Sequence, residues 1–281
     1  MFAKLALALA LVTLLQPSSD SPAEPSLTLE RITNFSNVVV NHVNGSIGTE
    51  SLPQGSGIAV EPGVFVTIGR NKLQVFDRDV AILQDGLVTD GTIAEECKSD
   101  CPAVLFDAFQ YEWLKMAVES SYLDIDIATR VIFAASADVP AQTLLMSAYA
   151  AAETRPGAVP TLSVLVNMAG RGLRAQPVFL LPPEGLTLQQ GSAALGLTIE
   201  FDTETFVVSG SDATLGRGKR GKSLTDVRRI LATVKKRYPG KDSIILVPRA
   251  GVNVGQLMTL VQVIRTSYPR IVLSLGQDVV I

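Results

Sequence analysis

The chain has 281 residues, of which 47% are apolar, 6% aromatic and 18% charged, and its formal net charge is −3. This length suits one large domain or two small ones. The high apolar and low charged content argues against a disordered chain and against a nucleic-acid-binding protein. Only one histidine, His42, and two cysteines, Cys97 and Cys101, are present. These counts exclude a histidine-rich metal site, a four-cysteine zinc site and a disulfide-dense scaffold, and we expect no metal and no cofactor.

The first residues have the features of a secretory signal peptide. Lys4 precedes an uncharged run at 5–15, and polar and helix-breaking residues follow at once. A membrane-spanning helix needs about 20 apolar residues, so this run is too short to span. Ser21-Pro22-Ala23 places small residues at a suitable cleavage site. We expect residues 1–23 to be removed and the mature chain to be periplasmic or secreted. The alternative is an uncleaved membrane anchor.

Export favours a disulfide between Cys97 and Cys101, because disulfides form and persist in oxidising compartments. The alternative is a redox-active pair. Such pairs usually have two intervening residues and lie at a helix start, whereas three residues separate Cys97 from Cys101 in a polar stretch. A structural staple is therefore the better interpretation.

The first half is predicted to alternate strands and helices after a polar leader at 24–56. Alternating apolar residues, helical spacing and turn residues define the elements. In chain order, they are strands at 57–61, 64–68 and 72–76, a helix at 106–121, a strand at 130–135, a helix from 138 to 153 and a strand at 161–166. Asp138 is predicted to cap the second helix, and Pro140 suits its first turn.

The second half repeats this order. Its predicted elements are strands at 196–200 and 205–208, a helix that Ser223 and Asp226 cap, a strand at 242–247, a helix that Asn253 caps and a strand at 271–275. The shared order suggests an internal duplication, in which Gly57 and Glu61 match Gly196 and Glu200, Tyr122 matches Tyr238, and Ala137, Val139 and Leu144 match Ala250, Val252 and Leu257. Residues 168–195 contain many glycines and prolines and are predicted to be a linker, with 178–181 as a candidate edge strand.

The pattern resembles the periplasmic domain of the ExbD/TolR family of biopolymer-transport proteins. The residues that carry the resemblance are the hairpin Val64-Phe-Val-Thr-Ile-Gly-Arg-Asn-Lys-Leu-Gln-Val-Phe76, the segment Val131-Ile-Phe-Ala-Ala-Ser-Ala-Asp138-Val139-Pro140 and the segment Ser243-Ile-Ile-Leu-Val-Pro-Arg-Ala-Gly-Val252-Asn253. The resemblance covers roughly residues 57–167 and 196–276. It implies an α/β (α+β) fold with two ExbD/TolR-like domains, at 57–167 and 196–281, each a small mixed sheet with two helices packed on it.

The resemblance also implies a function, with one departure. Family members have a membrane helix with an aspartate that takes part in coupling to the proton gradient, and residues 5–15 contain no acidic residue. We therefore expect a non-catalytic, exported accessory protein of a proton-motive-force-driven envelope transport or integrity system. Its implied partners are ExbB/TolQ-like or TonB/TolA-like proteins. The alternatives are peptidoglycan, a second copy of the chain, and an envelope interaction protein with no link to transport.

No residue pattern indicates catalysis. His42 has no motif around it, and a packed or surface histidine is the simpler interpretation than a general base. Residues 216–223 match the phosphate-loop pattern G-x-x-x-x-G-K-[ST] and precede a helix. However, no strand directly precedes this segment, and the later apolar run at 244–247 ends in Pro248 rather than an aspartate. Nucleotide binding is therefore a third hypothesis.

The most informative charge pattern is a basic cluster in the second half. Residues 217–241 contain ten Lys and Arg against one acid, Asp226. The candidate partner-binding residues are Arg217, Lys219, Arg220, Lys222, Arg228, Arg229, Lys235 and Lys236. A solvated helix face and a surface for an anionic partner are both consistent with the cluster. Residues 24–195 contain 10 basic and 19 acidic side chains, a net charge of −9, and residues 196–281 contain 13 and 7, a net charge of +6. The near-neutral total thus conceals two halves of opposite sign, and we expect them to bind different partners or to dock on each other.

Overall fold

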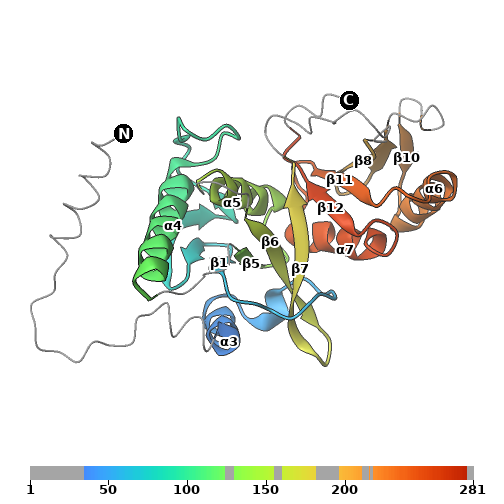
Figure 1. Ribbon diagram of the computed structural model, residues 1–281. Coiled ribbons are helices and arrows are strands. Elements are labelled where there is room, and N and C mark those ends of the chain that lie inside the picture. Colours follow the sequence, from blue (N-terminus) through green and yellow to red (C-terminus); the bar gives the residue numbers. More distant parts are fainter. Residues whose placement is uncertain are drawn as a thin grey trace, which may run out of the picture.

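The chain forms a mixed α/β fold around one sheet of twelve strands (Figure 1). In this computed structural model, the described residues are 35–123, 130–154, 160–181, 196–210, 215 and 218–276. The predicted signal peptide lies outside them. The described helices are α3 (Phe35–Ser46), α4 (Ala103–Leu123), α5 (Ala141–Glu153), α6 (Leu224–Arg237) and α7 (Val254–Ile264), with a 3-10 turn at Thr49–Ser51. The predicted α/β class is confirmed.

The strands follow the order β10-β9-β8-β11-β12-β7-β6-β5-β1-β2-β3-β4. Their bounds are β1 (Val64–Ile68), β2 (Lys72–Val75), β3 (Arg78–Gln84), β4 (Leu87–Val88), β5 (Arg130–Ala135), β6 (Thr161–Met168), β7 (Gly172–Leu180), β8 (Thr198–Phe201), β9 (Phe206–Ser209), β10 (Lys219–Gly221), β11 (Ser243–Pro248) and β12 (Arg270–Leu273). We expected a separate small sheet in each half. Instead, the strands of both halves join in one sheet.

The two halves nevertheless have the same internal order of strands. In the first half, β1 pairs antiparallel with β2 and parallel with β5, and β5 pairs parallel with β6. In the second half, β8 pairs in the same senses with β9 and β11, and β11 pairs parallel with β12. We call β5 and β11 the inner strands of the two halves. In the first half, α4 precedes β5 and α5 follows it; in the second half, α6 precedes β11 and α7 follows it.

Strand β7 lies between the two halves in the sheet, and the strands of one half run in the opposite direction to the equivalent strands of the other. It runs antiparallel to β6 and parallel to β12, so that β6 and β12 run in opposite directions. The two sets of strands are therefore related by an approximate two-fold rotation. The segment predicted to be a linker, 168–195, thus supplies a central strand rather than an edge strand. Pro177 is tolerated there because β12 joins β7 only at Phe179 and Leu180.

The register corrects the predicted match between the first strands of the halves. Ile68 of β1 pairs with Ala135 and Phe201 of β8 pairs with Pro248, which makes Ile68 and Phe201 equivalent. Glu200 therefore corresponds to Thr67, not to Glu61. The predicted strand at 57–61 is absent; only Ile58 forms an isolated bridge, with Ala175. A third strand, β3, which we did not predict, completes the first half.

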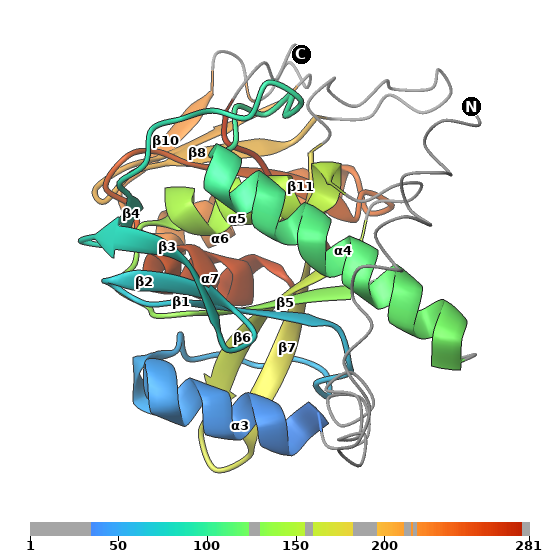
Figure 2. The same cartoon turned by 90° about the vertical axis from the view of Figure 1, so that its left-hand side faces the viewer.

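Both faces of the sheet are covered in the first half. Figure 2 shows α3 on one side of β1 and β2, and α4 and α5 on the other. α3 buries Phe35, Val39 and Val43, four residues apart on one helix face. The predicted polar leader at 24–56 is therefore wrong over 35–46. Within the described residues, no helix is long and apolar enough to cross a membrane.

Two of the three predicted helix caps are present. The Ser223 side chain accepts the Asp226 N–H at the start of α6, and Asn253 and Gln256 form a capping box on α7. Asp138 does not cap α5. It accepts a hydrogen bond from Ser136 Oγ at 2.6 Å and lies 3.5 Å from Arg70 Nε.

The N-terminal ends of α5 and α7 bind each other across the two-fold relation. Ala141 N–H donates to Val252 O at 2.9 Å, and Val254 N–H donates to Val139 O at 2.8 Å. The two bonds exchange equivalent residues, because Val139 corresponds to Val252 and Ala141 to Val254 in the register. Such reciprocal contacts are typical of an isologous dimer interface. We name residues 137–141 and 252–255 the junction.

Candidate binding face

The candidate partner-binding residues lie on β10 and α6. β10 is the last strand of the sheet and pairs antiparallel with β9. α6 buries Val227, Leu231 and Val234, so that its other face points to solvent. β10 and α6 are in contact with each other. The basic residues therefore gather at the end of the second half that is farthest from β7 in the sheet.

Five of these residues are exposed and form what we call the basic face. They are Lys219, Arg220, Lys222, Arg228 and Lys236. Among the described residues, no carboxylate lies within ion-pair distance of them. Arg217, the remaining predicted residue next to β10, lies outside the described residues. The basic face can therefore attract an anionic or acidic partner without first giving up an internal ion pair.

The other two predicted residues have contacts inside the second half. Arg229 Nη2 donates to Asp226 Oδ1 at 2.6 Å, and Lys235 Nζ donates to Lys241 O and lies 5.2 Å from the centre of the Tyr268 ring. Backbone and hydroxyl donors at Lys222 and Ser223, together with Arg229, lower the pKa of Asp226. Part of the basic cluster thus stabilises α6 itself, including its C-terminal turn, where cations are favourable.

The middle of the segment that matches the phosphate-loop pattern, residues 216–223, is strand β10. Lys219, Arg220 and Gly221 form β10 and pair with Val208, Val207 and Phe206. In a phosphate loop, successive backbone N–H groups surround the phosphates. Here the backbone of residues 219–221 pairs in a sheet ladder instead. Gly216 and Arg217 lie outside the described residues. The geometry disfavours the nucleotide hypothesis.

Among the residues that the structure describes, no ion pair joins the two halves. Arg229 pairs with Asp226, Arg249 with Glu200 and Arg270 with Asp242, and each of these pairs lies within the second half. The described contacts between the halves include the shared apolar core, the pairing of β7 with β12, backbone bonds at the junction and side-chain hydrogen bonds. One example is Arg265 Nη1, which donates to Gln176 Oε1 at 2.7 Å. The charge asymmetry therefore remains on the outer surface.

A cavity of about 610 Å³ lies between Gln142 of the first half and the Glu200–Arg249 ion pair of the second. Hydrogen bonding to Glu200 raises the pKa of Arg249. Arg249 and Glu200 form an ion pair in the wall of the cavity, so their charges neutralise each other. The described lining residues are Gln142, Glu200, Val247, Pro248, Arg249, Ala250, Leu275 and Gly276.

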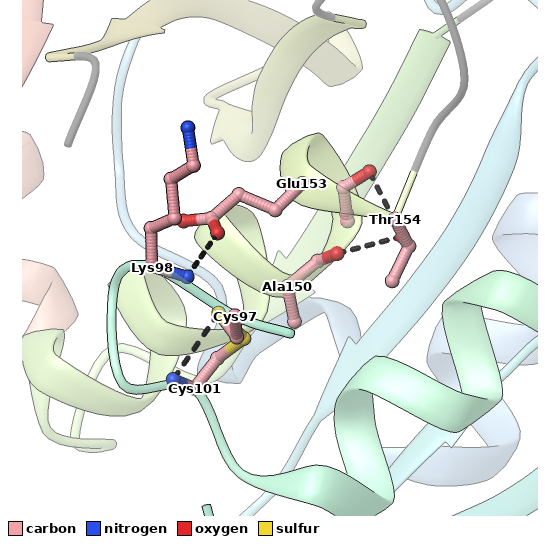
Figure 3. The surroundings of a disulfide bond; sticks show 7 residues. Cys97, Lys98, Cys101, Ala150, Glu153 and Thr154 are labelled. Carbon is pink, nitrogen blue, oxygen red and sulfur yellow. Dashed lines mark hydrogen bonds between the residues drawn. A yellow bond between two sulfur atoms is a disulfide. The ribbon is translucent and has the colours of Figure 1, made fainter. Parts of the chain in front are cut away.

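The two cysteines form a disulfide in the loop that precedes α4 (Figure 3). Cys97 and Cys101 are buried, and Cys101 N–H points at Cys97 Sγ at 3.3 Å. Lys98 N–H donates to Glu153 Oε2 at 2.6 Å. The loop therefore attaches to the C-terminal end of α5, which fits a structural staple.

His42 packs at the edge of the core. Its ring meets Phe65 edge to face at a centroid distance of 5.5 Å, between α3 and β1. Within the described part of the chain, no three His, Cys, Asp or Glu side chains lie together as a metal site requires.

Comparisons of the chain with known protein families, with curated proteins and with solved structures found no match to any of them.

Proposed function

We propose that the chain is an exported, non-catalytic binding protein that serves a proton-motive-force-driven envelope transport or integrity system. In this proposal the two halves are ExbD/TolR-like units in tandem, joined through β7. The membrane helix that couples family members to the proton gradient would come from partner proteins.

The observation that carries the proposal is the repeated order of elements. Three paired strands, a helix, a strand, a helix and a strand follow one another in both halves, and the first half has one more short strand, β4, before α4. The two segments that resemble the family, 131–140 and 243–253, occupy equivalent places, since each is the inner strand followed by the start of a helix. These starts meet at the junction, which leaves the outer ends of the sheet for partners.

The basic face is the proposed partner surface. It lies on an exposed edge strand and helix, away from the junction, and its cations have no described carboxylate partner. Aligned charges of one sign accelerate association with a partner of opposite sign and depend on ionic strength. By resemblance, the partner is an ExbB/TolQ-like or TonB/TolA-like envelope protein that presents acidic side chains.

Site-specific photo-crosslinking in the source cell tests this proposal. A photo-reactive amino acid is placed at position 236 on α6 and, as a matched control, at position 110 on α4, which is also an exposed helix position. We expect crosslinks from position 236 to an ExbB/TolQ-like or TonB/TolA-like protein, and none to that protein from position 110. The double variant Arg228→Glu with Lys236→Glu, crosslinked from position 233, should lose them. Crosslinks only to cytoplasmic proteins would contradict the proposal.

The same surface favours a second candidate partner, peptidoglycan, whose peptide stems carry carboxylates. Co-sedimentation of the purified protein with cell-wall sacculi separates the two candidates. If sacculi retain the protein, and the double variant or higher salt releases it, the wall is the partner. If the protein stays in the supernatant, the protein partner is favoured.

A further inference from the structure

A polar cleft in the first half is lined by two residues that each have a buried side-chain oxygen without a hydrogen-bond partner. The cleft has a volume of about 430 Å³ and lies between the C-terminal end of α3 and the strands β1 and β2. Its lining is mostly polar: Ser46, Ile47, Ser51, Thr67, Gly69, Arg70, Asn71, Lys72, Gln74, Ser136 and Asp138. This volume is within the range of small-molecule sites.

Thr67 and Gln74 line the buried side of the cleft, on the sheet. They are directly opposite each other in the β1–β2 ladder and are 1% and 7% exposed. Thr67 Oγ1 and Gln74 Oε1 have no hydrogen-bond partner in the protein. The Gln74 amide is fixed in orientation, because its Nε2 donates to Asp79 Oδ1 at 2.6 Å, which leaves Oε1 as an acceptor. Buried polar atoms without a partner are rare and destabilising, so each needs an explanation.

The fold itself does not require a polar pair at these positions. The equivalent pair in the second half is Glu200 and Val207, which are opposite each other in β8 and β9. Glu200 there pairs with Arg249, and Val207 has no polar side-chain atom. The unpartnered pair is therefore a property of the first half, where α3 covers the same face of the sheet.

Both cations at the cleft are already paired with carboxylates, which decides the class of ligand. Arg70 lies within 3.6 Å of Asp85 and Asp138, and Lys72 Nζ lies 3.4 Å from Asp79. An ion would have to compete with these pairs. A neutral ligand whose groups both donate and accept would fit better, since it could donate to Gln74 Oε1 and bond the Thr67 hydroxyl.

We propose that this cleft binds a neutral, hydroxyl-rich small molecule of the size of a monosaccharide or disaccharide. Thr67 Oγ1 and Gln74 Oε1 each expose less than 1 Å², so in this proposal the C-terminal end of α3 shifts outward and one ligand hydroxyl then accepts from Thr67 and donates to Gln74 Oε1. Hydroxyls of Ser46 and Ser51 contact its outer side. This site is independent of the basic face and of the proposed function.

Binding is tested by NMR on the full mature chain with glucose, N-acetylglucosamine and maltose as probes, and with inorganic phosphate and glycine as charged controls. We expect at least one sugar to give a saturable shift of the Gln74 side-chain amide signals. Thr67→Val and Gln74→Leu should each weaken that binding by about tenfold, the loss expected for one hydrogen bond in a dry site. No saturable shift with any sugar, or a shift only with the charged controls, would overturn the proposal.

Thermal unfolding without ligand gives a second test. Thr67→Val should raise Tm by about 2–4 °C, because it removes a buried hydroxyl that has no protein partner. The matched control is Thr198→Val, at a buried strand threonine whose Oγ1 bonds Gly196 O at 3.0 Å. The control should lower Tm. If Thr67→Val lowers Tm as the control does, the hydroxyl has a structural partner such as a bound water, and the proposal is wrong.

Discussion

Arg265 should be the most important single side chain for holding the two halves together. It follows α7 in the second half, and its Nη1 donates to Ser56 O, to Ser56 Oγ at 3.0 Å and to Gln176 Oε1 at 2.7 Å in the first half and β7. Gln176 is 4% exposed, and without Arg265 its Oε1 keeps only the longer bond from Gln262 Nε2, at 3.4 Å. Arg265→Met keeps the apolar stem and removes only the charged group.

The expected loss follows from these bonds. Hydrogen bonds from a charged donor contribute about 1.5–3 kcal/mol each, and Gln262 Nε2 remains to bond Ser56 O at 3.2 Å, so we expect a net loss of about 2 kcal/mol. The matched control is Arg270→Met. Arg270 has a 69% exposed side chain and lies 3.7 Å from Asp242, an arrangement that contributes at most about 0.5 kcal/mol.

Urea unfolding followed by tryptophan fluorescence measures both variants. Trp113 is the only tryptophan and lies in the first half, where it is buried and its Nε1 donates to Ala151 O at 3.1 Å. A lower midpoint for Arg265→Met, seen at this distant reporter, would show that the second half supports the first. If the two variants lose equal stability, the reasoning on Arg265 is refuted.

Three further predictions concern the disulfide, the buried tyrosine and the α7 cap. Replacing Cys97 and Cys101 by Ala should cost about 2 kcal/mol in urea unfolding, the entropy of closing so short a loop; no change would mean that the loop is fixed by its other contacts. Burial raises the pKa of Tyr149 to about 12, and unfolded tyrosine titrates near pH 10. The unfolded state therefore loses its proton first, and stability should fall between about pH 10 and 12. Tyr149→Phe should flatten that fall in a pH series of unfolding curves; an equally steep fall would place its cause elsewhere. Asn253→Ala should cost about 1 kcal/mol, measured in the same urea assay, because the Gln256 N–H loses its acceptor, Asn253 Oδ1; a loss as small as that of Arg270→Met would refute this role of the cap.

Elements with a regular apolar period were predictable from the sequence. The hairpin of β1 and β2, the buried strands β5 and β11, and the helices α4 to α7 were placed with the correct type. Each has a local signal: alternation, helical spacing or a cap at Ser223 or Asn253. The basic face was also predictable, because exposed positions on an amphipathic helix follow from its buried ones.

The features that depend on distant contacts were not predictable. α3 is rich in β-branched valine and in polar residues, which do not favour a helix. It is helical because Phe35, Val39 and Val43 are buried against β1. The N-terminal end of α5 needs no side-chain cap because Val252 O accepts the Ala141 N–H from the other half. Strand β7 contains Gly172 and Pro177, which are typical of a linker, and pairing with both β6 and β12 outweighs that local preference.

The polar cleft was missed for a related reason. Thr67 and Gln74 are ordinary strand residues in sequence, and only the register of β1 and β2 places them side by side. The absence of their partners follows from how α3 and the neighbouring carboxylates pack. A threonine facing a glutamine in two adjacent predicted strands is the one signal that was present.

The central claim is that two similar halves form one unit through β7 and the junction, and coincident unfolding tests it most directly. Trp113 fluorescence reports on the first half, whereas far-UV circular dichroism reports on the helices and strands of both. If the halves are one unit, the two urea transitions of the wild-type protein superimpose. Two separate transitions, with fluorescence following only one, would contradict the claim and leave the halves as independent domains.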